Sequence, residues 1–281
     1  MITEIDSPAS FMVKTSTYRS RFPYETQQMT SYVAELIDQD FQGWKFWIYS
    51  ISETVEAMFL MTPNNSVFIS PLNSEATTEI VTHLINEGFE VRRIVGELES
   101  AILLANLIKD KVPHVFEVEE EMKTNAYVLS SLNLYSSSTG AWRSASSDDR
   151  DLLIRWNSDY IREALGHEPE KVEILVDRVL KDQRTYFWVE NGVPVCMMGY
   201  SQPTPTPDEN IVRIFPVYTP SELRGRGFAK CLVSQICLKL KNDGLGIMLF
   251  ADSKNPQANE IYKKIGFVEI GFYGNLLLKT N

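Results

Sequence analysis

The sequence predicts a mixed α/β protein in which strands and helices alternate along both halves of the chain. Extended β-branched and aromatic runs recur between segments whose apolar residues repeat at helical spacing. Asparagine turns at Asn64-Asn65 and Asn191-Gly192 predict antiparallel hairpins, so much of the sheet should be antiparallel. The 281 residues suffice for one large domain or two smaller ones.

In the first half, Gly88 ends a helix that Ser74 caps, and Pro113 closes the next one. The predicted elements are a helix (26–41), a strand (44–49), a hairpin (57–62 and 67–70), a helix (74–86), a strand (91–95), a helix (100–109) and a mixed segment (114–121).

The second half repeats this rough order without a residue-level repeat. Its predicted elements are a strand (126–134), two helices (148–164 and 172–180), a hairpin (185–190 and 195–201), a strand beginning at 211, a helix (228–241), a strand (247–251), a helix (256–265) and a final antiparallel pair (268–272 and 275–279). We place the boundary within 117–140 and expect domains 1–122 and 123–281, with a shared sheet edge or a linker between them.

Composition narrows the function. Apolar residues make up 44% and charged residues 23%, which is ordinary for a globular protein. A net charge of −10 argues against nucleic acid or an anionic membrane as partner and fits a cationic substrate such as an amine. The N-terminus lacks the pattern of a signal peptide, and the apolar runs are too short to span a membrane. We therefore expect a cytoplasmic protein.

The three cysteines predict neither a metal site nor a reactive thiol. Cys196, Cys231 and Cys237 show no metal-ligand spacing and lie in apolar company, which is typical of core residues in a reducing compartment. His83, His114 and His167 are scattered among predicted helix and loop. No metal is expected.

The most informative segment is a strand, a basic glycine turn and a helix. The run 211–215 leads into the segment 217–229, and the helix behind it buries residues spaced 3, 4, 7 and 11 positions after Ala229. Gly225 and Gly227 permit backbone conformations that point successive N–H groups one way, and Arg224 and Arg226 add positive charge. Such a turn at a helix N-terminus predicts a site for a pyrophosphate-bearing cofactor.

A second segment, 249–267, carries another pattern. Asn255 is a good N-cap, Pro256 suits the first helical position and Gly266 suits the end of the helix. Tyr262 shares the inner face of this helix with Ala258. Its side chain is therefore expected to point inward.

The two segments together resemble the GNAT superfamily of N-acyltransferases. Arg224-x-x-Gly227-x-Ala229 resembles the acyl-CoA motif of that family, and 255–267 resembles its second signature. The resemblance implies a mostly antiparallel GNAT sheet flanked by helices, preceded by a degenerate GNAT-like first domain. That first domain would shape the substrate cleft or extend the sheet.

The resemblance also implies roles for single residues. Acetyl-CoA would be the cosubstrate. Its pantetheine would align along the main chain of Val217, Tyr218 and Thr219 and touch Asn255. Tyr262 would protonate the departing thiolate. The residues implied to hold the pyrophosphate are Arg224, Gly225, Arg226, Gly227, Phe228 and Ala229.

The general base is not assigned, because the strand 211–219 carries no Asp or Glu. Asp208 and Glu209 lie just upstream, and a water chain to a remote group is an alternative. Arg143 lies at the start of the second half. It either holds a substrate carboxylate or is a solvated arginine on the surface.

The sequence thus predicts an acetyl-CoA-dependent N-acetyltransferase that acts on a primary amine of a small molecule or peptide by direct attack. The alternative is a non-catalytic acyl-CoA-binding sensor or scaffold on the same fold. The acceptor stays open among polyamines, amino acids, aminoglycosides, peptide N-termini and protein lysines. A monomer or homodimer is expected.

Overall fold

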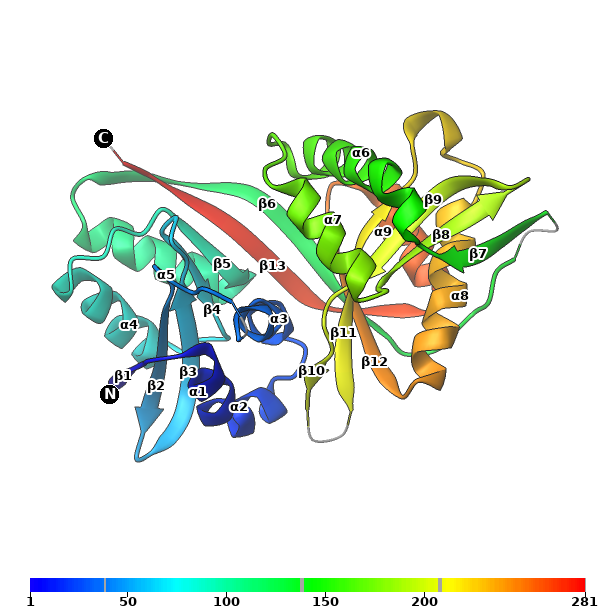
Figure 1. Cartoon of the computed structure of the whole chain (residues 1–281). Helices are drawn as coiled ribbons and strands as arrows, with labels where there is room; N and C mark the ends of the chain where they lie inside the picture. The colour runs from blue at the N-terminus through cyan, green and yellow to red at the C-terminus, as the bar shows by residue number, and fades with distance from the viewer. Residues whose placement is uncertain (38, 137–138, 207–208, 281) are drawn as a thin grey trace.

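One 13-stranded sheet runs through the whole molecule (Figure 1). The computed structural model describes residues 1–37, 39–136, 139–206 and 209–280. The strand order is β1-β2-β3-β4-β5-β13-β6-β12-β11-β9-β8-β7, with β10 paired to β11 beside this path. The pairs β4–β5 and β11–β12 are parallel and the other pairs are antiparallel. The mixed, mostly antiparallel sheet is therefore confirmed.

The two halves repeat one order of elements: a strand, a group of helices, three strands, a helix, a strand, a helix and a last strand. The first half contains β1 (Ile2–Ile5), α1 (Pro8–Lys14), α2 (Ser16–Arg21), α3 (Gln27–Leu36), β2 (Lys45–Ile51), β3 (Thr54–Met61), β4 (Ser66–Ile69), α4 (Ser74–Asn86), β5 (Arg93–Glu97), α5 (Leu98–Lys111) and β6 (Val115–Leu129).

The second half adds a short strand and three short helical turns to that order. It contains β7 (Gly140–Ser144), η1 (Ser147–Asp149), α6 (Arg150–Tyr160), the π-helical turn η2 (Ile161–Leu165), α7 (Val172–Lys181), β8 (Thr185–Glu190), β9 (Val193–Tyr200), β10 (Thr204–Pro205), β11 (Asn210–Tyr218), η3 (Ser221–Leu223), α8 (Phe228–Asn242), β12 (Leu245–Asp252), α9 (Pro256–Ile265) and β13 (Phe267–Thr280).

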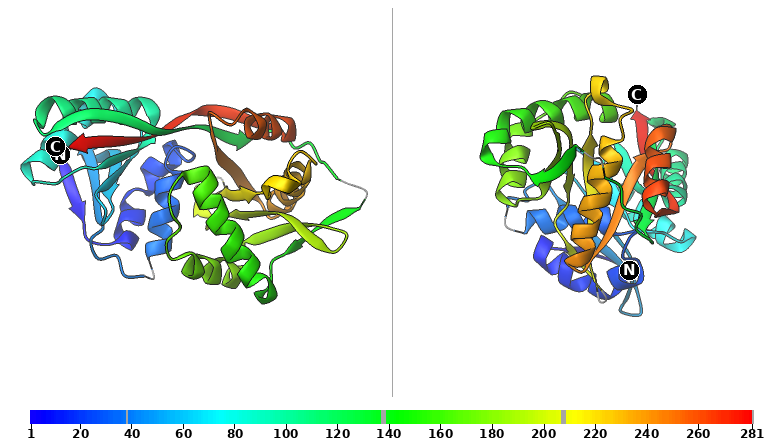
Figure 2. Two further views of the ribbon diagram at one scale, coloured as in Figure 1. Left: turned by 90° about the horizontal axis from the view of Figure 1, so that it is seen from above. Right: turned by 90° about the vertical axis from the view of Figure 1, so that its right-hand side faces the viewer.

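The halves exchange their last strands. The segment 124–128 of β6 pairs with β12 of the second half, and 273–277 of β13 pairs with β5 of the first half. Strands β6 and β13 also pair with each other over most of their length and bridge the two halves (Figure 2). Their exchange makes each half depend on a strand from the other.

This exchange explains two errors of the sequence prediction. The final antiparallel pair 268–272 and 275–279 is wrong, because β13 continues through Gly274 without a turn. Its backbone there is held by β5 on one side and β6 on the other. The segments 114–121 and 126–134, predicted separately, meet in the single strand β6, which contains 115–121 and 126–129.

Local signals explain most of the other boundaries. Asn65, Asn191 and Gly192 have positive φ values of 61°, 50° and 80°, which confirms both predicted hairpins. Helix α4 is capped by Asn73 instead of Ser74: the Asn73 side chain accepts a hydrogen bond from the Ala76 N–H at 2.8 Å. The sequence reading missed β1, α1 and α2.

Each half is a three-layer sandwich with helices on both faces of the sheet (Figure 1). In the first half, α4 and α5 cover one face and α1 to α3 cover the other. In the second half, α8 and α9 cover one face, whereas α6 and α7 cover the face that adjoins α3 of the first half. In the part of the chain that the structure describes, no helix is long and apolar enough to cross a membrane.

Candidate functional site

Strands β11 and β12 part at the centre of the second half. Residues 210–214 of β11 pair in parallel with 245–249 of β12, and this ladder ends although both strands continue. On its other side β11 pairs with β9, with a register shift between Ile214 and Val217. The β12-facing edge of β11 beyond Ile214 is therefore free to pair with something other than a strand. Val217, Tyr218 and Thr219, predicted to align pantetheine, lie on or directly after this segment.

The glycine turn that follows β11 adopts the predicted conformation. Gly225 and Gly227 have φ values of +78° and +83°, and Gly227 is the N-cap of α8. A Cβ built on either glycine would meet no atom within 4 Å, so the turn faces open space. No side chain caps α8, so the first N–H groups of this helix are available to an anion.

Arg224 is held in a network that the sequence did not predict. Its Nε donates to the Thr219 carbonyl at 2.8 Å and its Nη2 forms an ion pair with Glu163. The Tyr218 hydroxyl donates to the other carboxylate oxygen of Glu163 at 3.1 Å. Arg226 is exposed and reaches only the Glu222 carbonyl, at 3.5 Å. Arg226 is therefore open to a phosphate, whereas Arg224 must first leave Glu163.

Hydrogen bonds set the charge states in this network. The bond from Arg224 holds the pKa of the Glu163 carboxyl below its usual range, helped by the bond from Tyr218. Burial and the neighbouring Glu163 raise the pKa of Tyr218 to about 12. Glu163 lies on the π-helical turn η2, where no local motif marked it.

Tyr262 lies on α9, and the caps of this helix are those predicted. The Asn255 side chain accepts from the Ala258 N–H at 3.0 Å, and Gly266 ends the helix with a φ of +111°. The Tyr262 ring packs against Tyr127 and Phe267, with ring centroids 6.4 and 5.9 Å apart. The side chain therefore points inward, as expected. The side-chain oxygen of Asn255 is engaged as the cap.

The Tyr262 hydroxyl is a protonated donor at neutral pH. Burial raises its pKa well above the ordinary value for tyrosine, and the nearby Tyr160, Cys196 and Cys237 add to this effect. Among the described residues the hydroxyl has no hydrogen-bond partner. It is therefore available to donate a proton to a group that enters the site.

The remaining two residues of the predicted cradle form the start of α8. Phe228 is buried in the core between the sheet and α8, and Ala229 packs partly buried against the same cluster. Their side chains anchor the helix, so they offer only their backbone N–H groups to a ligand.

Arg143 is engaged in a structural ion pair, which is a correction to its candidacy for a substrate carboxylate. Its guanidinium donates two hydrogen bonds of 2.7 Å to Asp149. Asp149 also closes the capping box of η1 with Ser146. These bonds hold the pKa of the Asp149 carboxyl below its usual range. The pair thus fixes the entry to α6.

Asp208 and Glu209 are the two carboxylates that the sequence offers as the general base. Glu209 accepts a bond of 3.3 Å from the Tyr24 hydroxyl and lies against Gly246, at the paired end of β11 and β12 instead of the open end. Asp208 lies outside the described residues. Glu25, which the sequence did not single out, has a carboxylate oxygen that is buried without a hydrogen bond among the described residues.

Glu25 lies two residues before the start of α3 in the first half. Its charge contributes to the raised pKa of the buried Tyr273. The Tyr273 ring packs on Phe250 at 4.7 Å, and Phe250 is the first residue of β12 beyond the ladder with β11. The charge of Glu25 therefore acts on Tyr273, whose ring packs beside the opening between the strands.

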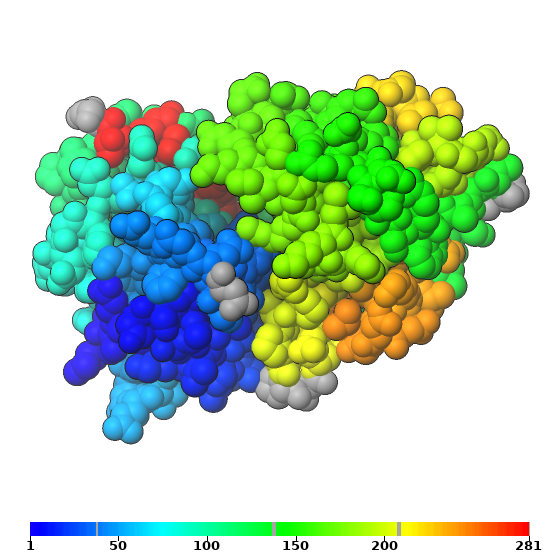
Figure 3. All heavy atoms as spheres, in the orientation of Figure 1, coloured from blue at the N-terminus to red at the C-terminus, as the bar shows by residue number. Residues whose placement is uncertain are grey.

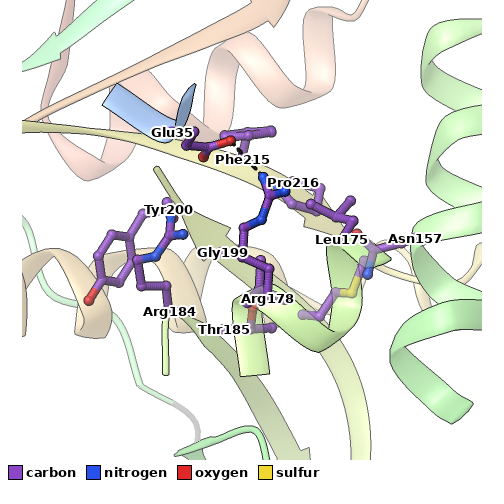
Figure 4. Close-up of a pocket in the computed structure, with 12 residues that line it drawn as sticks. Glu35, Asn157, Leu175, Arg178, Arg184, Thr185, Gly199, Tyr200, Phe215 and Pro216 are labelled. Carbon is purple, nitrogen blue, oxygen red and sulfur yellow. Dashed lines mark hydrogen bonds and ion pairs between the residues drawn. The ribbon is translucent and has the colours of Figure 1, made fainter. Parts of the chain in front are cut away.

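The surface is hollowed at the junction of the halves, between the first half and the green helices of the second (Figure 3). A pocket of about 30 Å³ lies there, and its lining includes Phe215 and Pro216 of β11 (Figure 4). Glu35 of α3 and Arg178 of α7 form an ion pair of 3.1 Å across it. The first half therefore contributes directly to the surroundings of the site.

The three cysteines belong to the core cluster against which Tyr262 packs. Cys196, Cys231 and Cys237 are buried and unbridged, as predicted. Residues 1–37, 39–136, 139–206 and 209–280 contain no group of three or more His, Cys, Asp and Glu side chains placed to hold a metal ion.

Comparison with known structures shows the same fold over the whole chain. A GNAT-family acetyltransferase from Colwellia psychrerythraea superposes with a TM-score of 0.60 at 10% identity, covering 100% of both chains. A Drosophila protein gives a TM-score of 0.69 at 10% identity, covering 99% of this chain and 98% of that one. A GCN5-related N-acetyltransferase from Sphaerobacter thermophilus gives 0.63 at 14% identity, covering 98% and 94%. No curated protein matches the sequence.

The sequence profile of the acetyltransferase (GNAT) family matches residues 150–267. This range runs from the start of α6 to the first residue of β13 and contains the open strand pair, the glycine turn and Tyr262. In these residues the chain is similar to the acetyltransferase (GNAT) family.

Proposed function

We propose that this protein is an N-acetyltransferase that moves the acetyl group of acetyl-CoA to a primary amine. The observation that carries the proposal is the meeting of three features: an open strand edge, an uncapped helix N-terminus and a protonated Tyr262. Each matches a different part of acetyl-CoA or of its reaction. The small-molecule or peptide nature of the amine is part of the proposal.

The binding residues fit the cosubstrate. The pyrophosphate would lie against the N–H groups of Gly225 to Ala229, where the glycine conformations leave open space. Arg226 would neutralise its charge. The amides of the pantetheine arm would pair with the backbone of Val217 and Thr219, which β12 leaves without a ladder.

The proposed chemistry is direct transfer. The amine nitrogen attacks the thioester carbonyl carbon, so a C–N bond forms and the carbonyl oxygen becomes an oxyanion. A backbone N–H near Val217 would stabilise that charge. The oxyanion then collapses, the C–S bond breaks, and the departing thiolate takes the proton of the Tyr262 hydroxyl.

Glu25 is our candidate for accepting the proton of the attacking amine, through water. Its buried oxygen without a partner among the described residues and its electrostatic effect on Tyr273, which packs on Phe250, support this role. The variant Glu25→Gln should lower kcat at least about tenfold without changing the KM for acetyl-CoA. Glu209→Gln, at the paired end of the strands, is the control and should change neither.

The function is tested by combining calorimetry of CoA binding with thiol release from acetyl-CoA in the presence of different amines. The panel should contain polyamines, amino acids, aminoglycosides and short peptides. Binding of CoA together with turnover on at least one amine supports the proposal. Tight CoA binding without turnover on any amine would instead identify a sensor or scaffold. Absence of CoA binding would contradict both.

A further inference from the structure

Arg213 is a buried cation in the middle of β11. Its exposed fraction is 6%, and it lies one residue before the ladder between β11 and β12 ends. Its neighbours Val212 and Ile214 belong to the core beneath α8. Because side chains alternate along a strand, Arg213 points to the other face, toward the first half.

Aromatic rings surround this guanidinium. Its Cζ lies 4.4 Å from the ring centroid of Phe215 and 5.8 Å from those of Tyr32 and Phe250. Tyr32 belongs to α3 of the first half, whereas the two phenylalanines flank the opening between β11 and β12. The rings stabilise the cation through their π faces and remove water from it.

No anion balances Arg213 among the residues that the structure describes. It forms no ion pair with any of them, and its buried Nε has no hydrogen-bond partner. The other two buried arginines of the described residues have side-chain partners. Arg19 donates to Thr15, Pro205 and Met12 without an ion pair, and Arg184 pairs with Asp182 at 2.7 Å, although its Nε also lacks a partner. Burying a charge without a partner is costly, so a ligand that supplies the anion would be bound strongly.

The guanidinium is coupled electrostatically to the proposed reaction centre. Its charge lowers the pKa of Tyr160 against the larger, opposite effect of burial. Tyr160 in turn contributes to the raised pKa of Tyr262. Tyr160 therefore lies within electrostatic reach of both Arg213 and the proposed general acid.

A groove of the first half shares one residue with the surroundings of Arg213. Tyr32, which faces Arg213, also lines a groove of about 490 Å³ formed by residues of the first half. The remaining lining residues are Trp44, Thr62, Pro63, Asn64, Ser66 and Phe68. Tyr32 therefore lies between this groove and the guanidinium of Arg213.

We propose that Arg213 binds a carboxylate of a substrate at the reaction centre. The proposal rests on the proposed function and names a chemical class within it: the carboxylate belongs to the amine acceptor, as in an amino acid, or to the acyl group, as in a dicarboxylic acyl-CoA. The planar guanidinium has donors that match both oxygens of a carboxylate. The pyrophosphate is not the ligand, because its cradle lies beyond the far end of β11.

The first arm of the test compares substrates that differ only by a carboxylate. Alanine is compared with ethylamine, and phenylalanine with phenethylamine, using acetyl-CoA. Succinyl-CoA is compared with propionyl-CoA on one amine. A kcat/KM that is at least about 100-fold higher with the carboxylate in one arm supports the proposal and identifies the source. Equal values in both arms would overturn it.

The second arm uses variants. Arg213→Gln should remove the preference for the carboxylate while the rate with the uncharged partner changes little, and Arg213→Lys should restore part of it. Arg184→Gln is the matched control: it disturbs another buried arginine and should leave the preference intact. If Arg213→Gln lowers all rates equally, the role of Arg213 is structural and the proposal fails.

Binding separates this proposal from the proposed function. The wild-type protein with CoA bound is titrated calorimetrically with alanine and with ethylamine, and the free protein is titrated with succinyl-CoA and with propionyl-CoA. Preferential binding of the carboxylate compound supports the role of Arg213 even if no amine is acetylated. Turnover without any carboxylate preference in rate or binding supports the proposed function alone and contradicts the role of Arg213.

Discussion

Glu163 holds Arg224 away from the space above the glycine turn. The ion pair joins the π-helical turn after α6 to the segment after β11, and the Tyr218 hydroxyl completes it with a bond of 3.1 Å. A bound pyrophosphate and Glu163 would therefore compete for the same guanidinium. When acetyl-CoA binds, either this ion pair breaks or Arg224 does not contact the pyrophosphate.

This competition predicts that Glu163→Gln tightens CoA binding. Removing the carboxylate frees Arg224 and removes a negative charge near the pyrophosphate. At this partly exposed site the gain should be about 1 kcal/mol, or about fivefold in Kd measured by calorimetry. Glu168→Gln, an exposed carboxylate paired with Arg162, is the control and should not alter Kd. Weaker CoA binding by Glu163→Gln would show instead that Glu163 positions Arg224 for the ligand.

The glycine turn should be sensitive to a single added methyl group. Gly227→Ala introduces a Cβ at a φ of +83°, which costs about 1–2 kcal/mol of stability and places a carbon in the cradle. CoA affinity should fall at least tenfold, about 1.4 kcal/mol. Gly88→Ala has a similar φ of +72° and equally open surroundings at the end of α4. It should cost the same stability, and a similar loss of CoA affinity there would contradict a cradle at Gly227.

The exchange of last strands predicts that a residue near the C-terminus stabilises the first half. Leu276 is 1% exposed and packs in the core formed with α4 and α5. Leu276→Ala should cost about 2–5 kcal/mol. It should also speed hydrogen exchange in β4 and β5, measured by mass spectrometry. Leu277→Ala is the control, because Leu277 lies on the opposite face of β13 and is less buried. Equal rates of hydrogen exchange in β4 and β5 of the two variants would contradict the packing of Leu276 in the first half.

The pair between Arg143 and Asp149 should make stability depend on pH. The pKa of Asp149 is lowered in the folded state, chiefly by Arg143. The stabilisation is therefore present above the ordinary aspartate pKa of about 3.9 and is lost as pH falls through the folded-state value.

Arg143→Gln should accordingly cost about 1 kcal/mol at pH 7 and less as the solution becomes acidic. Urea unfolding at a series of pH values measures this difference. Arg150→Gln breaks the more exposed pair with Asp177 and should cost less at every pH. A cost of Arg143→Gln that is constant down to pH 2 would contradict the ionic origin.

The helices and hairpins of this fold follow from local signals. Asn191-Gly192, Asn255 with Pro256, and the glycines 225 and 227 act through backbone conformation and capping, which depend on neighbouring residues alone. These signals also identified the turn and Tyr262. The strand exchange is different: Gly274 permits a turn, and only the pairing with β5 and β6 keeps the chain extended there.

The rest of the site depends on contacts between distant segments. Glu163 and Arg224 are 61 residues apart, and Tyr32 reaches Arg213 from the other half of the chain. Arg143 was a candidate ligand in the sequence because its partner Asp149 became apparent only from the geometry of η1. The sequence does not mark Arg213, because an arginine within a β-branched strand gives no sign of whether an anion will lie beside it in the fold.

The central claim is that Tyr262 protonates the departing thiolate during acetyl transfer. The most direct measurement is the steady-state kinetics of Tyr262→Phe compared with Tyr127→Phe. Tyr127 packs against Tyr262, and its hydroxyl donates a hydrogen bond to the Asn259 side chain. Because the pKa of Tyr262 lies well above that of free tyrosine, the wild-type rate should show no loss from its ionisation between pH 7 and pH 10. We predict that Tyr262→Phe lowers kcat about 100-fold or more with little change in the KM for acetyl-CoA, whereas Tyr127→Phe retains activity. An unchanged kcat in Tyr262→Phe would contradict the account.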